Sequence, residues 1–367
     1  MQFREKGNVF LPITLLVVIF ISLFLYLIVR KSNNSGNINQ NNIGTFFGEK
    51  QMNCESNKNP RFSSEFTDLS KIQHLAPIGG IMVGSPARSY IFLKEGAADT
   101  PIYAPTDAIL EGIVYAKRMD PNNPNASIAK GEYRLDFRVS CEVTFHFDHI
   151  DTVNDEIKKL WKGEPIDNTR EAQRINFKVK AGDLLGYTNG TDASRGFDFF
   201  LLNTSKVVSH VNPERWQWEQ TTIADCPYDY FTEDLKTKYY NAFASQDGKK
   251  LIVQNCGSIS HDVAGTASGG WFQENSKDTQ GKWLEIGNIN GKVEMTIRES
   301  GSYNFAIRDY QPAIMPEKLA VGNSTCYSGE GNWAHIKLLS DNKLAVVKGS
   351  GNCPADFSES MSELWER

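Results

Sequence analysis

Residues 9–29 constrain this chain more than any other feature, because they read VFLPITLLVVIFISLFLYLIV and carry no charged side chain. A helix rises about 1.5 Å per residue, so this stretch is long enough to cross the roughly 30 Å hydrocarbon core of a bilayer. A cleaved signal peptide is the alternative. It would have a shorter apolar core and a small-residue cleavage site, whereas Arg30 and Lys31 follow here. We predict that residues 1–31 form a short cytoplasmic tip and an uncleaved, single-pass transmembrane anchor.

The cysteines decide the predicted orientation, because basic residues flank the apolar stretch on both sides and the positive-inside rule barely distinguishes them. All six cysteines follow the anchor, and none forms a Cys-x-x-Cys metal motif. An even number of widely spaced cysteines is typical of disulfides in an oxidising compartment. We favour the pairs Cys226–Cys256 and Cys326–Cys353, with Cys54 and Cys141 as the remaining candidates. The N-terminus is therefore expected inside the cell membrane and the bulk of the chain outside it.

Length and charge narrow the classes of protein further. The 367 residues are enough for two domains, and the formal net charge is −5 without a Lys/Arg cluster, which argues against a nucleic-acid binder. Residues 32–43 read SNNSGNINQNNI, which is polar, nearly uncharged and has little to bury. We predict a flexible tether over residues 32–65.

Short apolar and alternating runs separated by turn residues predict a mainly β protein. Residues 66–220 are expected to form one β-domain, with a short helix over residues 154–161 and a loop at residues 119–127. A second helix is expected over residues 232–244, inside a segment (221–247) that bridges two domains. Residues 248–367 are expected to form a second, antiparallel β-barrel-like domain, whose first strand is KKLIVQNC (249–256).

Four tryptophans are candidate ligand-binding residues. Trp216 and Trp218 lie two apart, on one face if the segment is a strand, and Trp271 and Trp333 each follow glycines at the start of an expected strand. They could form a stacking platform for sugar rings, or the Gly-x-Trp opening of a lipocalin-like barrel. The alternative is that tryptophans fill the core or plug the barrel end.

Part of the first domain resembles the lysostaphin-type (LytM-like) zinc metallopeptidases. The resemblance covers about 140 residues and rests on TPIYAP (100–105) with DAILEGIV (107–114), FDHI (147–150), VKAGDLLGY (179–187) with GFDFF (196–200), and the Asn-Pro pair at 212–213. It implies a β-sandwich or barrel-sandwich fold. In that family, zinc is held by the His and Asp of an H-x-x-x-D element and by the second His of H-x-H.

This chain departs from the family at the zinc ligands. Counted back without gaps from residue 100, the H-x-x-x-D positions fall near Ser89 and Leu93, and the second His of H-x-H is Phe200. Of the five chemical positions only His149 is kept, with Asp198 as a polar replacement. A catalytic zinc needs three protein ligands and an open position for water, so we predict no metal and assign no catalytic residue.

His149 and Asp198 remain as relic positions, which could form either a residual acid/base pair or a structural polar pair. His146 lies three residues before His149. On a regular strand the two would point to opposite faces, so a joint metal site is not expected, and His146 is expected to be exposed or half-buried.

These observations predict a membrane-anchored, extracytoplasmic binding or scaffolding protein that uses an inactive metallopeptidase-like domain. Its partner is expected to be a protein, peptide or glycan at the cell surface, and no cofactor is expected. One alternative is an active zinc endopeptidase acting on cell-wall or surface peptides, with ligands such as His74, His149 or Asp198. Another is a C-terminal barrel that binds a small apolar ligand.

Overall fold

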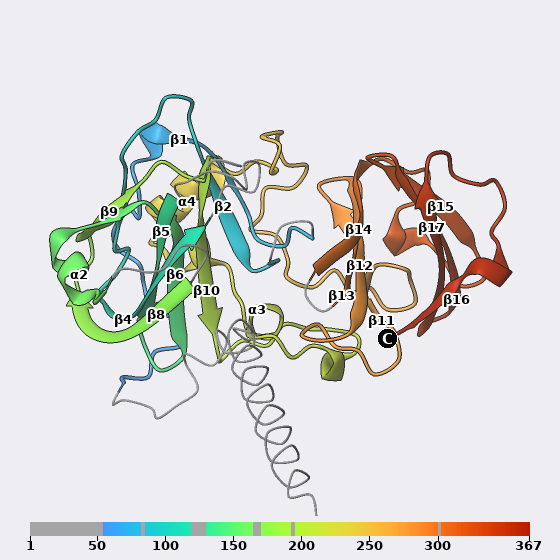
Figure 1. Ribbon diagram of the computed structural model, residues 1–367, viewed down its shortest axis with the longest axis horizontal. Helices are drawn as coiled ribbons and strands as arrows, with labels where there is room; N and C mark the ends of the chain where they lie inside the picture. Colours follow the sequence, from blue (N-terminus) through green and yellow to red (C-terminus); the bar gives the residue numbers. More distant parts are fainter. Residues whose placement is uncertain (1–53, 82–84, 119–129, 164–169, 192–194, 300–301) are drawn as a thin grey trace, which may run out of the picture. The chain divides into compact units, whose positions relative to one another are not determined.

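The computed structural model describes residues 54–81, 85–118, 130–163, 170–191, 195–299 and 302–367, and it is mainly β (Figure 1). The predicted anchor at residues 9–29, most of the predicted tether and the predicted loop at residues 119–127 lie outside the described residues. Among the helices of the described ranges, none is long and apolar enough to cross a membrane. The anchor therefore stays a prediction.

Seven antiparallel strands build the first sheet, in the order β1-β2-β10-β6-β5-β4-β8. A smaller sheet has the order β3-β9-β7. The bounds of these strands are β1 (Ile72–Ala76), β2 (Arg88–Leu93), β3 (Thr100–Tyr103), β4 (Ala108–Arg118), β5 (Lys130–Arg138), β6 (Val143–Ile150), β7 (Thr152–Val153), β8 (Arg170–Val179), β9 (Leu184–Thr188) and β10 (Gly196–Asn203).

An aromatic core covers one face of the seven-stranded sheet. Phe147 on β6 and Phe199 on β10 are fully buried, and their ring centroids lie 4.7 Å apart. Phe66 packs on both, at 6.0 Å from Phe147 and 5.1 Å from Phe199. Because successive strand residues point to opposite faces, the residues between these aromatics face the other side of the sheet.

The structure confirms both predicted helices. The side chain of Asn154 caps α2 (Asp155–Leu160) by accepting a 2.8 Å hydrogen bond from the amide of Ile157. Thr232 precedes α4 (Glu233–Asn241). The remaining helices are α3 (Glu219–Thr222) and the 3-10 turns η3 (Leu69–Lys71), η4 (Pro213–Arg215), η5 (Pro227–Tyr230), η6 (Pro316–Lys318) and η7 (Glu359–Met361).

Two segments expected to lie outside the first β-domain, the end of the tether and the bridging segment, contribute side chains to its core. Tyr239 of α4 is fully buried, and its ring lies 5.0 Å from that of Phe66, so α4 packs on this core. The predicted tether was expected to reach residue 65, but Phe62 is also fully buried, and its ring lies 5.7 Å from Phe145. The aromatic side chains explain both differences, since burying a ring of this size stabilises an ordered chain.

Eight antiparallel strands build the second sheet, which is barrel-like and nearly closed. The end strands β14 and β15 approach each other, with the rings of Tyr310 and Tyr327 6.3 Å apart. The order is β14-β13-β12-β11-β18-β17-β16-β15, with the bounds β11 (Gly269–Phe272), β12 (Lys282–Ile289), β13 (Lys292–Glu299), β14 (Ser302–Tyr310), β15 (Ser324–Gly329), β16 (Asn332–Ser340), β17 (Lys343–Ser350) and β18 (Glu363–Glu366).

Side chains fill the interior of this second sheet. Trp271 and Trp365 are fully buried there together with aliphatic residues from five other strands and Tyr327 of β15. The Trp271 indole donates a 2.9 Å hydrogen bond to the carbonyl of Ala267, which satisfies its polar edge. A filled interior favours tryptophan as core over the ligand-holding barrel considered from the sequence.

The predicted strand KKLIVQNC at residues 249–256 is wrong. Ile252 is 72% exposed and Val253 is 63% exposed, and the segment joins neither large sheet. Its main chain finds a side-chain partner instead, since the amide of Ile252 donates a 2.6 Å hydrogen bond to Asn290 Oδ1. The sequence predictions also lack four short strands, β1, β7, β15 and β18.

Three disulfides connect the six cysteines in the described part of the chain. Both favoured pairs, Cys226–Cys256 and Cys326–Cys353, are present, with Cα–Cα distances of 6.1 and 6.5 Å. The third, Cys54–Cys141, has a Cα–Cα distance of 5.3 Å and ties the first described residue to the turn between β5 and β6. Three disulfides are consistent with an extracytoplasmic location.

Replacing Phe66 tests the role of the aromatic core. Because the ring is fully buried among other aromatics, Phe66→Ala should lower the free energy of unfolding by about 3–5 kcal/mol. Ile252→Ala is the control at an exposed position and should change it by less than about 0.5 kcal/mol. Urea unfolding followed by tryptophan fluorescence measures both, and similar losses in the two variants would contradict this account.

Candidate functional site

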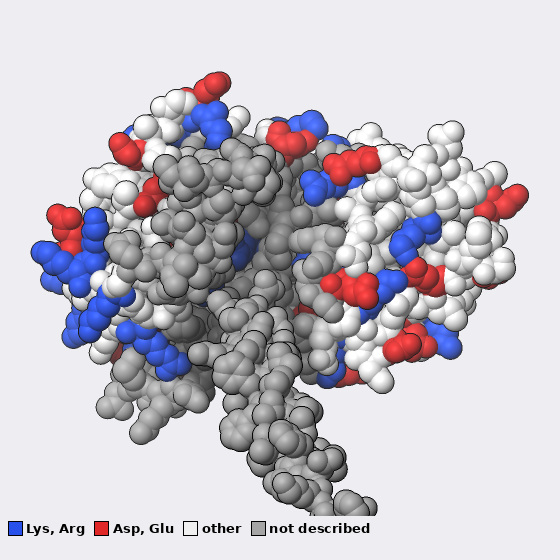
Figure 2. Space-filling model, in the orientation of Figure 1, with Lys and Arg blue, Asp and Glu red and all other residues white. Residues whose placement is uncertain are grey.

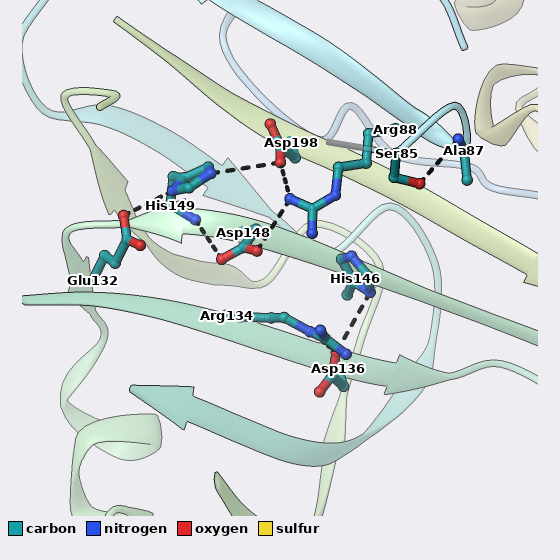
Figure 3. Close-up of polar contacts among 10 residues, drawn as sticks. All are labelled: Ser85, Ala87, Arg88, Glu132, Arg134, Asp136, His146, Asp148, His149 and Asp198. Atoms are coloured by element: carbon teal, nitrogen blue, oxygen red, sulfur yellow. Dashed lines mark hydrogen bonds and ion pairs between the residues drawn. The ribbon is translucent and has the colours of Figure 1, made fainter. Parts of the chain in front are cut away.

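The non-aromatic face of the seven-stranded sheet carries a cluster of five charged side chains at its centre (Figure 3). They come from four strands and are mostly buried, because β10 and β6 are interior strands of the sheet. We call this group the His149 cluster; its members are Arg88 on β2, Glu132 on β5, Asp148 and His149 on β6, and Asp198 on β10.

A β-bulge in β6 brings two consecutive residues to this face. Tyr133 pairs with Ile150 and Leu135 pairs with Phe147, so two residues of β6 lie opposite one residue of β5. The backbone of His149 has a φ of 64°, in the left-handed region. A bulge re-aims the side chains that follow it, and here Asp148 and His149 both join the same cluster.

The bulge corrects the expectation for the two histidines of β6. On a regular strand His146 and His149 would point to opposite faces, but the extra residue places both on the polar face (Figure 3). His146 was also expected to be exposed or half-buried, and it is only 2% exposed. Its ring packs against Phe200, with the centroids 4.2 Å apart.

Both ring nitrogens of His149 contact carboxylates. Nδ1 lies 2.7 Å from Glu132 Oε2, and Nε2 lies 3.5 Å from Asp198 Oδ2. The backbone is fixed as well, because the hydroxyl of Thr188 donates a 2.7 Å hydrogen bond to the His149 carbonyl. The predicted His149–Asp198 pair is therefore present, but Glu132 is the closer partner.

Arg88 supplies the second cation of the cluster. Its guanidinium donates a short hydrogen bond to Asp198 and lies 3.4 Å from Asp148 Oδ2. The side chains of Asp148 and Asp198 are only 5% and 1% exposed. Buried carboxylates need a paired cation, and a guanidinium meets two of them with fixed geometry.

These ion pairs keep His149 protonated. Burial by itself lowers the pKa of His149, but the hydrogen bonds to Asp198 and Glu132 and the charge of Asp148 raise it to about 10. Two cations then face three carboxylates. An imidazolium has no lone pair, so at neutral pH His149 can neither accept a proton as a base nor bind a metal.

A second ion-pair group lies beside the first on the same face. Arg134 Nε donates a 2.6 Å hydrogen bond to Asp136 Oδ1, and His146 Nδ1 lies 3.5 Å from the same oxygen. Gly112 on β4 leaves room for this carboxylate, since a Cβ there would lie 3.1 Å from Asp136 Oδ2. The polar face is thus occupied by paired charges over more than one strand pair.

The residues at the family's zinc positions do not fit a zinc ion. Ser89 faces the core, where its hydroxyl donates a 2.7 Å hydrogen bond to the carbonyl of Ala76, and Leu93 is buried. Glu132, Asp148 and His149 do place possible ligand atoms within 4.8 Å of one another. The protonated imidazole and the adjacent guanidinium of Arg88 oppose a further cation there.

Three further residues named from the sequence lie away from the His149 cluster's contacts. His74 stacks on Phe92, with ring centroids 4.5 Å apart. Trp216 is 6% exposed and stacks on His210 at 4.1 Å, while Trp218 precedes α3, so the two do not share a strand face. Buried rings offer no stacking surface, so Trp216 and Trp271 are wrong as members of a sugar platform.

Trp333 is less buried than Trp216 and Trp271. Its Nε1 donates a 3.1 Å hydrogen bond to the carbonyl of Ser350, on the neighbouring strand β17. The ring also lies over Gly349, where a Cβ would come within 2.5 Å of it. Trp333 therefore packs on its own sheet, on the face opposite the filled interior, and it is not part of the core as the alternative expected.

The sequence reasoning missed Arg88, Glu132 and Asp148. A signal was present, because charged residues alternate with apolar ones in EYRLDF (132–137) and FHFD (145–148). That alternation predicts a charged strand face but leaves open whether this face is exposed to water or buried in ion pairs with other side chains. Only the strand order β2-β10-β6-β5 brings these side chains together.

No family model, no curated protein and no solved structure matches this chain.

Replacing Arg88 tests the ion pairing. Arg88→Met leaves Asp148 and Asp198 without their guanidinium, so the free energy of unfolding should fall by about 3–5 kcal/mol. Arg61→Met is the matched control, because the Arg61–Glu233 pair is exposed and should contribute less than about 1 kcal/mol. Chemical unfolding at neutral pH measures both, and equal small losses would show that the Arg88 pairs do not stabilise the fold.

The protonation of His149 can be measured directly. Glu132→Gln removes the closer carboxylate charge, so the His149 pKa should fall from about 10 toward its ordinary value of 6.5, as followed by NMR titration of the imidazole. Because the folded pKa is the higher one, this pair stabilises fully below pH 6.5, and its contribution is lost as the pH rises through 10. A wild-type His149 that titrates near 6.5 would contradict the assignment.

Proposed function

We propose that this chain is a membrane-anchored, extracytoplasmic binding or scaffolding protein whose metallopeptidase-like β-domain is not catalytic. The observation that supports this most is the His149 cluster. The one residue kept at the family's chemical positions has both ring nitrogens next to carboxylates, and Arg88 occupies the space between Asp148 and Asp198.

The chemistry of the cluster favours structure over catalysis. A general base works best with a pKa near the operating pH, whereas the pKa of His149 is raised to about 10. A catalytic zinc needs three ligands and an open position, and here the available carboxylates already neutralise two cations. The cluster therefore stabilises the sheet, and we propose that a partner binds to surfaces of the protein outside the cluster.

The location rests on two independent arguments. Residues 9–29 support a single-pass anchor, and the three disulfides support an oxidising exterior compartment for the bulk of the chain, which puts the N-terminus inside. Degenerate members of the family that the sequence resembles act as regulators of other envelope enzymes. By analogy, we propose a protein, peptide or glycan partner at the cell surface.

The surface charge bears on how such a partner is held. Over the described part of the face in view, acidic and basic side chains are both present between uncharged ones (Figure 2). With a formal net charge of −5, the chain has no large positive excess to attract anionic polymers. Shape and local hydrogen bonding are the recognition modes that remain.

The proposal can be separated from the zinc endopeptidase alternative by metal content. Full-length protein purified in detergent without reductant should contain no stoichiometric zinc and should not cleave cell-wall peptides. The alternative expects one zinc per chain, and expects Asp198→Asn to lose it. Stoichiometric zinc that depends on Asp198 would overturn the proposal.

A complementation experiment tests the scaffold role in cells. The His149→Gln variant should restore wild-type behaviour to a deletion strain when its abundance equals that of the wild-type protein, because the proposal assigns His149 no chemistry. Removing residues 9–29 should not restore it, because the anchor holds the protein at its partner. His210→Gln is the matched control, since His210 also pairs with a carboxylate, at 3.3 Å from Asp262. Loss of function in His149→Gln alone would favour an enzyme.

A further inference from the structure

A second candidate site lies in the eight-stranded sheet, away from the residues that the proposed function uses. Cys326 on β15 and His335 on β16 are directly paired across the two strands. The disulfide brings Cys353 to the same place, and the two sulfurs and a ring nitrogen of His335 all lie within 4.8 Å of one another.

His335 is a histidine without an assigned role. Its neighbours Ala334 and Ile336 face the filled interior, so His335 faces outward, yet it is only 5% exposed. The chain after β17 covers it, since Phe357 packs edge-on against the imidazole at 5.3 Å. Nδ1 of this buried ring has no hydrogen-bond partner among the described residues, and an unpartnered buried polar atom is costly.

We propose that reduction of the Cys326–Cys353 disulfide converts this corner into a Zn²⁺ site with Cys326, Cys353 and His335 as ligands. Two equivalents of a thiol reductant break the S–S bond by thiol–disulfide exchange: they supply two electrons and two protons, are themselves oxidised to a disulfide, and leave Cys326 and Cys353 as thiols; a phosphine with one water does the same and becomes a phosphine oxide. Zn²⁺ then displaces one proton from each thiol and accepts a lone pair from the neutral imidazole. The fourth position is left to water, as in zinc sites with three protein ligands.

The geometry and the protonation states suit this ion. Zn–S bonds of about 2.3 Å and Zn–N bonds of about 2.0 Å need ligand atoms roughly 3–4 Å apart, so the two sulfurs, which are bonded to each other in the oxidised protein, must move apart after reduction while the His335 nitrogen already lies within 4.8 Å of them. The Cα atoms of Cys326 and Cys353 are 6.5 Å apart, so the sulfurs can separate without moving the backbone far. Burial lowers the pKa of His335, which keeps its lone pair available at neutral pH.

The site would also hold the covering segment in place. In the oxidised protein the disulfide fastens residues 351–362 over β16, together with the 2.5 Å contact between Lys337 and Glu359. After reduction without metal, that disulfide constraint is gone. A zinc bound by Cys353 and by two strand residues replaces it, so the same surface persists in both redox states.

Cobalt binding tests the site, because Co²⁺ takes the same ligands as zinc and gives a thiolate charge-transfer absorption. Full-length protein in detergent is treated with a phosphine reductant and titrated with Co²⁺. We expect one Co²⁺ per chain with this absorption after reduction and none before it. Alkylation mapped by mass spectrometry should show that Zn²⁺ protects Cys326 and Cys353 but not Cys54 or Cys141.

A histidine variant distinguishes metal binding at the proposed site from metal binding by the cysteine thiols alone. His335→Gln leaves every disulfide intact and should weaken Co²⁺ binding at least about 100-fold, since even outer-shell changes cost 10–100-fold. His74→Gln is the matched control at a buried histidine on β1, outside the eight-stranded sheet, and should bind as the wild type does. Unchanged binding in His335→Gln, no absorption in the reduced protein, or equal protection of all thiols would each overturn the proposal.

Discussion

Burial of charge on the central strands is the constraint on which the first sheet depends. Asp148 and Asp198 lie on adjacent interior strands, directly opposite each other in the β6–β10 register, where they are buried and water does not solvate their charges. Like charges in such positions repel, and a carboxylate removed from water without a partner costs several kcal/mol. Arg88 from the next strand and the protonated His149 supply the compensating charge.

The β-bulge in β6 is what makes this compensation possible. A regular strand would have turned His149 into the aromatic core, beside Phe145 and Phe147. The extra residue instead returns it to the polar face, where its two nitrogens meet Glu132 and Asp198. The result is an ion-paired, hydrogen-bonded group that suits a scaffold better than a reaction centre, because catalysis needs a group free to exchange a proton.

Much of the local structure could be predicted from the sequence. The periodic runs gave most strands of both sheets, and the Asn154 and Thr232 caps gave the two helices, because these signals act over a few residues. The failures are informative. KKLIVQNC has strand propensity but joins neither large sheet, and Phe62, expected in the tether, is buried in the first core.

The candidate site could be predicted only in part, because local sequence signals do not show which distant residues meet in the fold. FDHI and GFDFF drew attention to His149 and Asp198, and the absent histidines already argued against zinc. Arg88 could not be found, because it lies 110 residues from Asp198 in the sequence and meets it only through strand pairing. The contact between Glu132 and His149 depends on the β-bulge in β6, and the sequence carries no clear signature of that bulge.

By itself, the sequence determined what depends on composition and short-range pattern: an apolar stretch long enough for a membrane, a mainly β chain, six cysteines that suit an oxidising compartment, and the lack of zinc ligands at the family's positions. The tertiary structure decided everything that depends on which strands are neighbours. It set the partners of His149, the occupation of the polar face by Arg88, the filled interior of the second sheet and the meeting of His335 with a disulfide. Long-range pairing is a property of the whole fold, because each such contact joins residues that no local preference connects.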